Sequence, residues 1–294
     1  MIKSSPDSLN GALETSYIRD VLFQGEAFNV GLNYHNEQNK TIKYLELFEI
    51  NQDLIEHSKK NLNKIILYHM GDELGQKDKK LYSSCDFVIR NYFFDEFISE
   101  KYHPNIIWAP NGYRTGVGPR ASKSLKRVTE RNAFASFLGW IDNSKSFNNE
   151  RFLFVEAAKK CQEKIFFLAT NGFSGGYSVG LYSAIMEDSI FAPCPAGNSP
   201  ETIRLYDALE LGCIPISLRH DFLSSQRALA AIGLPPFPLL NSWYELPIFL
   251  QEMNSLFTSN PNMLLEMQKQ CIDWWGNYKI YISKKISDKI STLN

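Results

Sequence analysis

Short apolar runs alternate with polar segments along the first half of the chain. The apolar runs cover residues 44–48, 65–70 and 87–89, and the polar segment 51–61 has the composition of a helix. This alternation is typical of β-strands separated by helices. We therefore expect the first half of the chain to form an α/β domain.

A turn-rich, basic stretch separates the two halves of the chain. Residues 109–119 contain several Pro and Gly residues, and the stretch that follows to residue 132 is polar and basic, so we place a linker near 115–132. At 294 residues the chain exceeds the usual size of a single domain. We predict an N-terminal domain at 1–125 and a C-terminal domain at 130–276.

The second half repeats the α/β alternation. Strands are predicted at 133–138 and 164–169, with a helix at 149–161 between them. Two Rossmann-like halves are therefore expected.

The C-terminal residues predict two further helices. They cover 263–274 and 278–290, and Gly276 lies between them. The last helix, within 277–294, repeats isoleucine every fourth residue, which gives it an apolar face. We expect this helix to pack back on the N-terminal domain.

The segment 190–217 contains a strand, a loop, a helix and another strand. Ser199 is predicted to cap the helix, with Pro200 at its first position and Glu201 as a favourable charge in its first turn. Gly212 is predicted to end the helix in a left-handed conformation.

The start of this helix is a candidate anion site. Free backbone N–H groups and the helix dipole favour an anion there, such as a diphosphate. Arg204 can reach a phosphate, and Asp207 can accept hydrogen bonds from ribose hydroxyls. The chemistry alone leaves an equal alternative, in which Arg204 and Asp207 pair with each other on the helix surface.

The string PAGNSPETIRLYDALELGCIPI at 195–216 resembles the C-terminal signature of exostosin-type glycosyltransferases. Shorter pieces at 69–73, 86–92, 111–113 and 173–176 resemble most the ribitol xylosyltransferase branch and exostosin-like enzymes of some large DNA viruses of algae. Exostosin loops usually read Pro-Arg-Gly where this chain has alanine in the middle, so Arg204 or Arg151 is expected to supply the missing guanidinium.

The resemblance implies a GT-B architecture, with two Rossmann-like domains facing across a cleft. It places a nucleotide-sugar donor in the second domain and the acceptor in the first. The residues expected to bind the donor are Gly139, Arg151, Asn171, Tyr177, Pro195, Gly197, Asn198, Ser199, Glu201, Thr202, Arg204 and Asp207.

The acceptor side also needs a base that takes the proton of the attacking hydroxyl. Asp72 and Glu73 follow the strand 65–70, and ligands of open α/β sheets bind at this end of a strand. A solvated turn is the alternative interpretation of this acidic pair. The residues expected to bind the acceptor are His69, Arg90, Asn91, Tyr92 and Tyr113.

The predicted reaction is an inverting transfer of a sugar to a hydroxyl of a glycan. No Asp-x-Asp motif occurs in the sequence, so we predict metal-independent catalysis with no metal ligands and no cofactor besides a UDP-sugar substrate. The nearest resemblance favours UDP-xylose, while composition and motifs leave the donor sugar and the acceptor open.

Composition narrows the partners and the compartment. The net charge of −1 argues against a nucleic-acid partner. Five scattered cysteines without a Cys-x-x-Cys motif favour a reducing compartment. No signal peptide or membrane span is recognisable, so we expect a soluble, cytoplasmic protein.

Two other functions compete with the transferase prediction. The segment 172–176 fits the Gly-x-Ser-x-Gly motif of serine hydrolases, with Ser174 as nucleophile and Asp207 and His220 following in the expected order. Against this, polar Thr170 and Asn171 separate the motif from the preceding strand. A non-catalytic protein that binds nucleotide sugars or carbohydrates stays open, because the same donor loop would serve it.

Overall fold

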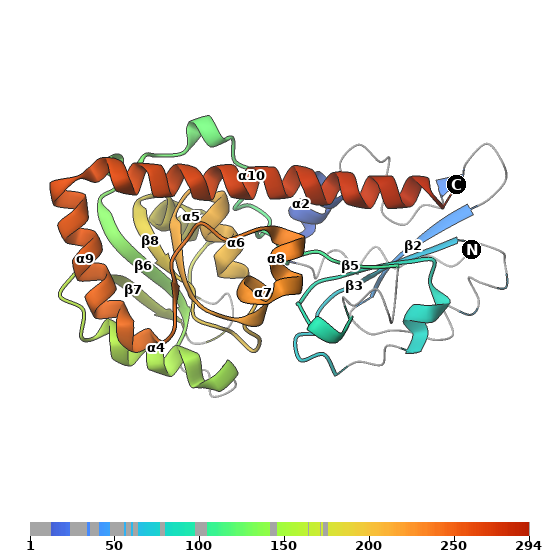
Figure 1. The fold of residues 1–294 in the computed structure, drawn as a ribbon, viewed down its shortest axis with the longest axis horizontal. Coiled ribbons are helices and arrows are strands. Elements are labelled where there is room, and N and C mark those ends of the chain that lie inside the picture. The colour runs from blue at the N-terminus through green and yellow to red at the C-terminus, as the bar shows by residue number, and fades with distance from the viewer. Residues whose placement is uncertain are drawn as a thin grey trace. The chain divides into compact units, whose positions relative to one another are not determined.

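The fold is known from a computed structural model of the chain. It describes residues 13–23, 34–35, 41–47, 56, 60, 64–76, 80–97, 105–141, 146–163, 165–170, 172 and 176–293. The chain divides into two compact units, drawn in Figure 1. Unit 1 comprises residues 1–111 and 279–294, and unit 2 comprises residues 112–278. Most of the helix predicted at 51–61 lies outside the described residues.

Unit 1 is built on a five-stranded sheet with the strand order β1-β2-β3-β4-β5. Strands β2 to β5 are parallel to their neighbours, whereas β1 runs antiparallel to β2. The strands are β1 (Tyr34–His35), β2 (Thr41–Leu47), β3 (Lys64–His69), β4 (Phe87–Arg90) and β5 (Ile106–Trp108). The short helices are α2 (Thr15–Tyr17), η1 (Ile18–Leu22), η2 (Lys80–Ser84) and η3 (Asp95–Phe97).

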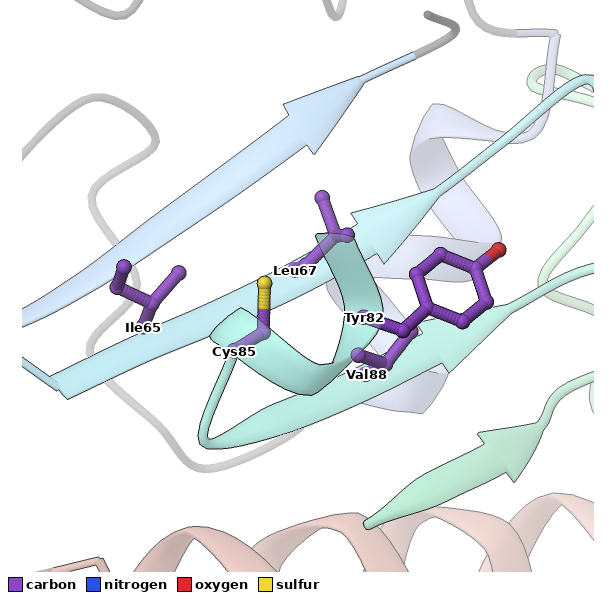
Figure 2. Packing of buried hydrophobic residues seen from close by; sticks show 5 residues of the cluster. All are labelled: Ile65, Leu67, Tyr82, Cys85 and Val88. Carbon is purple, nitrogen blue, oxygen red and sulfur yellow. The ribbon is translucent and has the colours of Figure 1, made fainter. Parts of the chain in front are cut away.

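The η2 segment covers one face of the unit 1 sheet. Figure 2 shows Tyr82 and Cys85 over Ile65 and Leu67 of β3 and Val88 of β4. Ile65 and Leu67 alternate with residues that point to the other face, as the period of a strand requires. Both faces of β3 are nonetheless buried. A parallel strand that is covered on both faces reads as a continuous apolar run, which explains why β3 was predictable.

Unit 2 is built on a second five-stranded sheet, with the order β10-β9-β8-β6-β7 and parallel pairing throughout. The first strand of the unit, β6, therefore lies between β7 and β8. The chain adds β7 on one side of β6 and then returns to add β8 on the other side. Such a reversal of strand order is where open α/β sheets bind their ligands, beyond the carboxyl ends of the strands.

The elements of unit 2 cover residues 122–278 of the chain. Its strands are β6 (Ala133–Trp140), β7 (Ile165–Thr170), β8 (Ser189–Pro193), β9 (Ile214–Leu218) and β10 (Leu239–Leu240). Its helices are η4 (Ser122–Ser124), η5 (Val128–Glu130), η6 (Phe147–Asn149), α4 (Glu150–Ala158), α5 (Val179–Glu187), α6 (Ile203–Glu210), α7 (Asp221–Ser224), α8 (Gln226–Ile232), η7 (Trp243–Glu245) and α9 (Leu246–Ser259), followed by the first part of α10.

Aromatic residues form the core beneath α4. The ring of Phe154 on α4 lies 4.8 Å from that of Phe137 on β6 and 5.1 Å from that of Trp243 on η7. All three side chains are buried. Offset and edge-to-face ring contacts of this kind add to the free energy gained by burying the apolar area. They fix α4 against the sheet, and α4 carries part of the candidate site described below.

The two C-terminal helices predicted on either side of Gly276 form one continuous helix, α10 (Pro261–Ser291), drawn in red in Figure 1. The predicted break is wrong, because a glycine inside a helix costs only about 1 kcal/mol and the buried face continues past it. Ile282, Ile286 and Ile290 are buried as predicted. Residues 279–291 of this helix belong to unit 1. Among the described helices, none combines the length and the apolar composition needed to cross a membrane.

Candidate functional site

The carboxyl ends of β6 and β8 meet at the strand-order reversal of unit 2. Arg204 of α6 lies there, with 7% of its surface exposed, and its Nη2 atom donates a hydrogen bond to the carbonyl of Leu138. The guanidinium lies 4.3 Å above the ring of Phe137. A Cβ atom added at Gly139 would collide with Nη2 of Arg204, so the glycine leaves room for the guanidinium in this position. The structure thus brings the predicted residues Gly139 and Arg204 together.

Helix α6 begins three residues later than predicted. Ser199 does not cap it, because its hydroxyl donates to the carbonyl of Glu201, and the helix starts at Ile203 after Thr202. Glu201 accepts a hydrogen bond from the hydroxyl of Tyr206 at 3.0 Å. These contacts lengthen the loop at the expense of the first predicted turn of the helix.

The end of α6 agrees with the prediction. Gly212 has a φ of +69°, and its N–H donates to the carbonyl of Leu209 while that of Cys213 donates to the carbonyl of Ala208. This pair of bonds is the Schellman arrangement, in which a glycine in the left-handed conformation closes a helix.

The loop before α6 presents unused hydrogen-bond donors. Within the described part of the chain, no group accepts a hydrogen bond from the backbone N–H of Gly197, Asn198, Ser199 or Thr202. The Nε atom of Arg204 is also buried without a partner. Unpaired N–H groups in a loop that leads into a helix, together with a buried guanidinium on that helix, suit an anion. The loop can therefore hold a phosphate or diphosphate.

Arg151 holds the middle of this loop. Its Nε atom donates to the carbonyl of Ala196 at 3.1 Å, and its Nη1 atom donates to the carbonyl of Trp140. Arg151 reaches both because Asn148 and Asn149 adopt left-handed conformations and turn the chain directly into α4. Asparagine tolerates this conformation better than most residues. The guanidinium of Arg151 thus lies beside the Pro-Ala-Gly loop and binds backbone carbonyls there, while its expected contact with a phosphate stays a prediction.

Asp207 occupies a different environment from the one predicted. It is fully buried, and Arg114 donates to its two carboxylate oxygens from the backbone N at 2.8 Å and from Nε at 2.7 Å. The hydroxyl of Tyr182 donates to it at 3.0 Å. Burial raises the pKa of Tyr182 above its ordinary value, and the charge of Asp207 raises it further. The carboxylate of Asp207 is therefore not exposed to a ribose in this structure, and its ion partner is Arg114 instead of Arg204.

Tyr177 connects the Asp207 cluster to the candidate anion site. Its ring stacks on that of Tyr182 with centroids 5.7 Å apart, and its hydroxyl donates to the carbonyl of Leu138 at 3.4 Å. That carbonyl is the one that Arg204 also contacts. Tyr177 is partly exposed and lies beside the end of β6, and its predicted role in donor binding stays a prediction.

Of the remaining residues predicted for donor binding or hydrolysis, some are described by the structure and others are not. Pro195 is buried, whereas Asn198 is exposed at the tip of the loop. Asn171 and Ser174 lie outside the described residues. His220, the third member of the hydrolase triad, faces Glu150 at 3.1 Å, while Asp207 binds Arg114 and Tyr182. The two described members of that triad thus have other partners.

In unit 1, the predicted residues gather at the carboxyl ends of β3 and β4. His69 and Arg90 are paired neighbours across these strands. Arg90 is fully buried, and its Nη2 atom lies 3.3 Å from Oδ2 of Asp72, which is 3% exposed. The hydroxyl of Tyr82 bonds with Nδ1 of His69 and accepts a hydrogen bond from Nη1 of Arg90. Burial raises the pKa of Tyr82 to about 12.

Glu73, Asn91 and Tyr92 complete the unit 1 cluster. The hydroxyl of Tyr92 donates to Oε1 of Glu73 at 3.2 Å, and the side-chain oxygen of Asn91 accepts from the N–H of Gly71. Tyr92 has a φ of +58°, which is strained for an aromatic residue, and Arg90 holds this turn by donating to the carbonyls of Asn91 and Tyr92. Such strain is found most often at functional sites.

Tyr113 was also expected to bind the acceptor. It belongs to unit 2, is fully buried and packs against Gly118. Three contributors were missed by the sequence analysis, namely Tyr82, Arg114 and Glu150. Arg114 contacts Asp207 from 93 positions away, whereas Tyr82 and Glu150 lie near predicted residues in the sequence but belong to no motif that marks them.

Comparison with known proteins bears on the family and on the fold. Residues 119–293 match the family described as RXYLT1 C-terminal domain. Ribitol-5-phosphate xylosyltransferase 1 of Homo sapiens is 24% identical over 182 residues, which cover 54% of this chain and 38% of the human protein. The match thus spans little more than a third of that relative's length.

Two solved structures share the fold at 10% sequence identity each. An alpha-glucosyltransferase solved with UDP and a 13-mer DNA has a TM-score of 0.50, covering 85% of this chain and 80% of its own. HepE of Anabaena, solved with UDP, has a TM-score of 0.51, covering 87% of this chain and 79% of its own. These neighbours have the GT-B fold, which confirms the predicted fold class.

The family match also confirms the resemblance to exostosin-like glycosyltransferases and their ribitol xylosyltransferase branch, while the viral relatives stay a prediction. Since residues 119–293 make up more than half of the chain, the protein belongs to the RXYLT1 C-terminal domain family.

Proposed function

We propose that this protein is a glycosyltransferase that uses a UDP-sugar. The observation that supports this most strongly is the loop before α6, where unpaired N–H groups lead into the helix that carries the buried guanidinium of Arg204. A diphosphate supplies the acceptors that these donors lack. As the bond between the sugar and the diphosphate breaks, negative charge develops on the departing UDP, and fixed donors stabilise it.

The proposed donor is UDP-xylose, after the name of the human relative. Calorimetric titration of the purified chain with UDP, UMP and ADP tests the nucleotide, and a panel of UDP-sugars tests the sugar. UDP should bind more tightly than UMP, because the second phosphate meets the open N–H groups. If neither UDP nor any UDP-sugar binds, the proposal fails.

We further propose that the transfer inverts the anomeric centre and needs no metal ion. The acceptor hydroxyl attacks the anomeric carbon as the bond to the β-phosphate oxygen breaks, and a carboxylate takes the hydroxyl proton. Proton NMR of the product reports the anomeric configuration. Turnover that persists in EDTA supports the metal-independent route, and turnover that requires an added divalent cation contradicts it.

Glu73 is the proposed base, in preference to Asp72. Asp72 is almost completely buried and its charge is paired with Arg90, whereas Glu73 is partly exposed and holds one hydrogen bond from Tyr92. Glu73→Gln should lower turnover by about 100-fold and leave UDP affinity unchanged. If Asp72→Asn lowers turnover more than Glu73→Gln in proteins of equal thermal stability, the assignment is reversed.

A further inference from the structure

Glu150 is a buried carboxylate that the proposed mechanism does not use. It is the first residue of α4 and is 2% exposed. Its Oε1 atom accepts hydrogen bonds from the N–H of Ala196 at 2.9 Å and from Nε1 of Trp243 at 3.0 Å. Its Oε2 atom lies 3.1 Å from Nε2 of His220, which follows β9. Glu150 therefore joins three parts of unit 2 at one point.

The contact with Ala196 is one half of a clamp. Glu150 binds the N–H of Ala196, and the next residue, Arg151, binds its carbonyl. The carbonyl of Gly197 accepts a hydrogen bond from the N–H of Phe147 at 2.7 Å. Both polar atoms of Ala196 and the carbonyl of Gly197 are thus fixed by residues 147–151, whereas the N–H groups that follow are left open.

We propose that Glu150 is the positioning residue of the donor loop. By fixing the N–H of Ala196, it aims the next N–H groups, those of Gly197 and Asn198, before a nucleotide arrives. Donors that are held in place need no ordering when the ligand binds, and this raises affinity. This inference rests on the proposed donor site. It also accounts for the alanine where exostosins have an arginine. Residues of α4 hold this loop through the backbone of Ala196, so no side chain is needed at that position.

Unit 2 contains a matched control for this role. Glu210, at the other end of α6, is also 2% exposed and also accepts one backbone N–H and one tryptophan Nε1, those of Arg120 and Trp275 at 2.6 Å each. These two hydrogen bonds hold the segment before η4 and helix α10, and neither involves the donor loop. A general loss of stability should therefore follow from changing either glutamate, while a loss of nucleotide affinity should follow only from changing Glu150.

The test measures the Kd of UDP by calorimetry and the thermal midpoint for Glu150→Ala, Glu150→Gln and Glu210→Ala. Glu150→Ala should weaken UDP binding by about 10- to 100-fold, which corresponds to one lost charge-assisted hydrogen bond. Glu150→Gln should stay within about threefold of the wild type, since the amide oxygen can still accept from Ala196. Glu210→Ala should lower the thermal midpoint and leave the Kd within about twofold.

Two results would overturn the proposal, namely unchanged UDP affinity in Glu150→Ala or equal losses in Glu150→Ala and Glu210→Ala. If the wild type binds no UDP, it is the proposed function that fails. Amide hydrogen exchange on the wild-type protein gives a test that needs no variant to fold. Without nucleotide, the Ala196 amide should exchange slowly and the Asn198 amide fast, and UDP should slow only the second. Equally fast exchange at both positions would contradict the clamp.

Discussion

The two sheets of this protein end in polar clusters of opposite kinds. At the carboxyl edge of the unit 1 sheet, charges and hydroxyls bind one another, as in the pairs Asp72–Arg90 and Glu73–Tyr92. At the carboxyl edge of the unit 2 sheet, the loop before α6 keeps backbone donors open beside Arg204. The first cluster is closed in the sense that its carboxylates bind other members of it, and the second lacks a partner that an anion would supply.

Topology accounts for part of this difference. In unit 2 the strand order reverses at β6, and ligands of open α/β sheets bind at such a reversal. Residues 147–151 hold the backbone of Ala196 and the carbonyl of Gly197 there, and the N–H groups that follow stay open. In unit 1 the described strands β2 to β5 follow one another in sequence order, and the loops after β3 and β4 lie side by side. Their polar side chains meet each other there. A buried carboxylate such as that of Asp72 is stable only when its charge is paired, as it is here by Arg90.

The comparison is tested most strongly by Arg204→Ala. If the unit 2 edge binds the diphosphate, this change should lower turnover by about 100- to 1,000-fold and weaken UDP binding, because it removes a buried positive charge beside the open donors. Steady-state kinetics and calorimetry check this. Arg131→Met is a matched control, because Arg131 is also buried in unit 2 but donates to the carbonyls of Ser189 and Leu211. Unchanged UDP affinity in Arg204→Ala would show that the open donors bind something else.

Arg90→Met tests the closed cluster of unit 1. The change leaves the carboxylate of Asp72 buried without its ion partner, so the free energy of unfolding should fall by about 3 kcal/mol. Urea denaturation measures this loss, and adding Asp72→Asn should restore part of it. UDP affinity should stay near that of the wild type, because the proposed donor loop lies in unit 2. A variant of wild-type stability would contradict the closed network.

The pH dependence of stability reports on Tyr82. Its pKa of about 12 in the folded protein exceeds its ordinary value of 10.0, so the unfolded chain loses this proton first as the pH rises. The contribution is complete below pH 10 and is lost towards pH 12, a fall of about 2 to 3 kcal/mol in the free energy of unfolding. Urea denaturation across this window should show a loss of stability that is larger in the wild type than in Tyr82→Phe by this amount, because Tyr182 and the other buried groups contribute equally to both. Parallel curves would contradict burial of this hydroxyl.

Gly139→Ala gives the smallest expected effect. It shifts the guanidinium of Arg204 without removing its charge, and so tests whether the position of that charge matters. The added methyl group meets the end of the Arg204 side chain, which can move at little cost in stability, so UDP affinity should fall about tenfold with little change in the thermal midpoint. Gly276→Ala is the control. Its Cβ would meet no atom within 4 Å, and it should stabilise the protein by about 0.5 to 1 kcal/mol. Equal UDP affinities for Gly139→Ala and the wild type would exclude a positional role of Arg204.

Local signals predicted several elements correctly. The apolar run 65–70 predicted β3, and Gly212 predicted the end of α6, because each depends on neighbouring residues alone. The start of α6 was predicted wrongly, because that prediction also used neighbouring residues alone. Ser199 and Pro200 have the residue types that begin a helix, yet the hydroxyl of Ser199 binds the loop instead.

Other features depend on residues that are far apart in the sequence. Asp207 was predicted to face a ribose, but Arg114 lies 93 positions earlier and binds it in the fold. Glu150 and Ala196 are 46 positions apart, and Tyr82 reaches His69 only because η2 folds over β3. Nothing in a local pattern shows which distant group satisfies a buried polar atom.

The sequence by itself determined the α/β alternation, the donor-loop motif and the family, since these follow from periodicity and from a contiguous string of residues. Only the tertiary structure decided which polar groups are paired and which stay open. That distinction depends on burial, because a polar group that leaves water must find a partner in the fold or wait for one from a ligand. Nε of Arg204 and the open N–H groups of the loop before α6 have no such partner among the described residues.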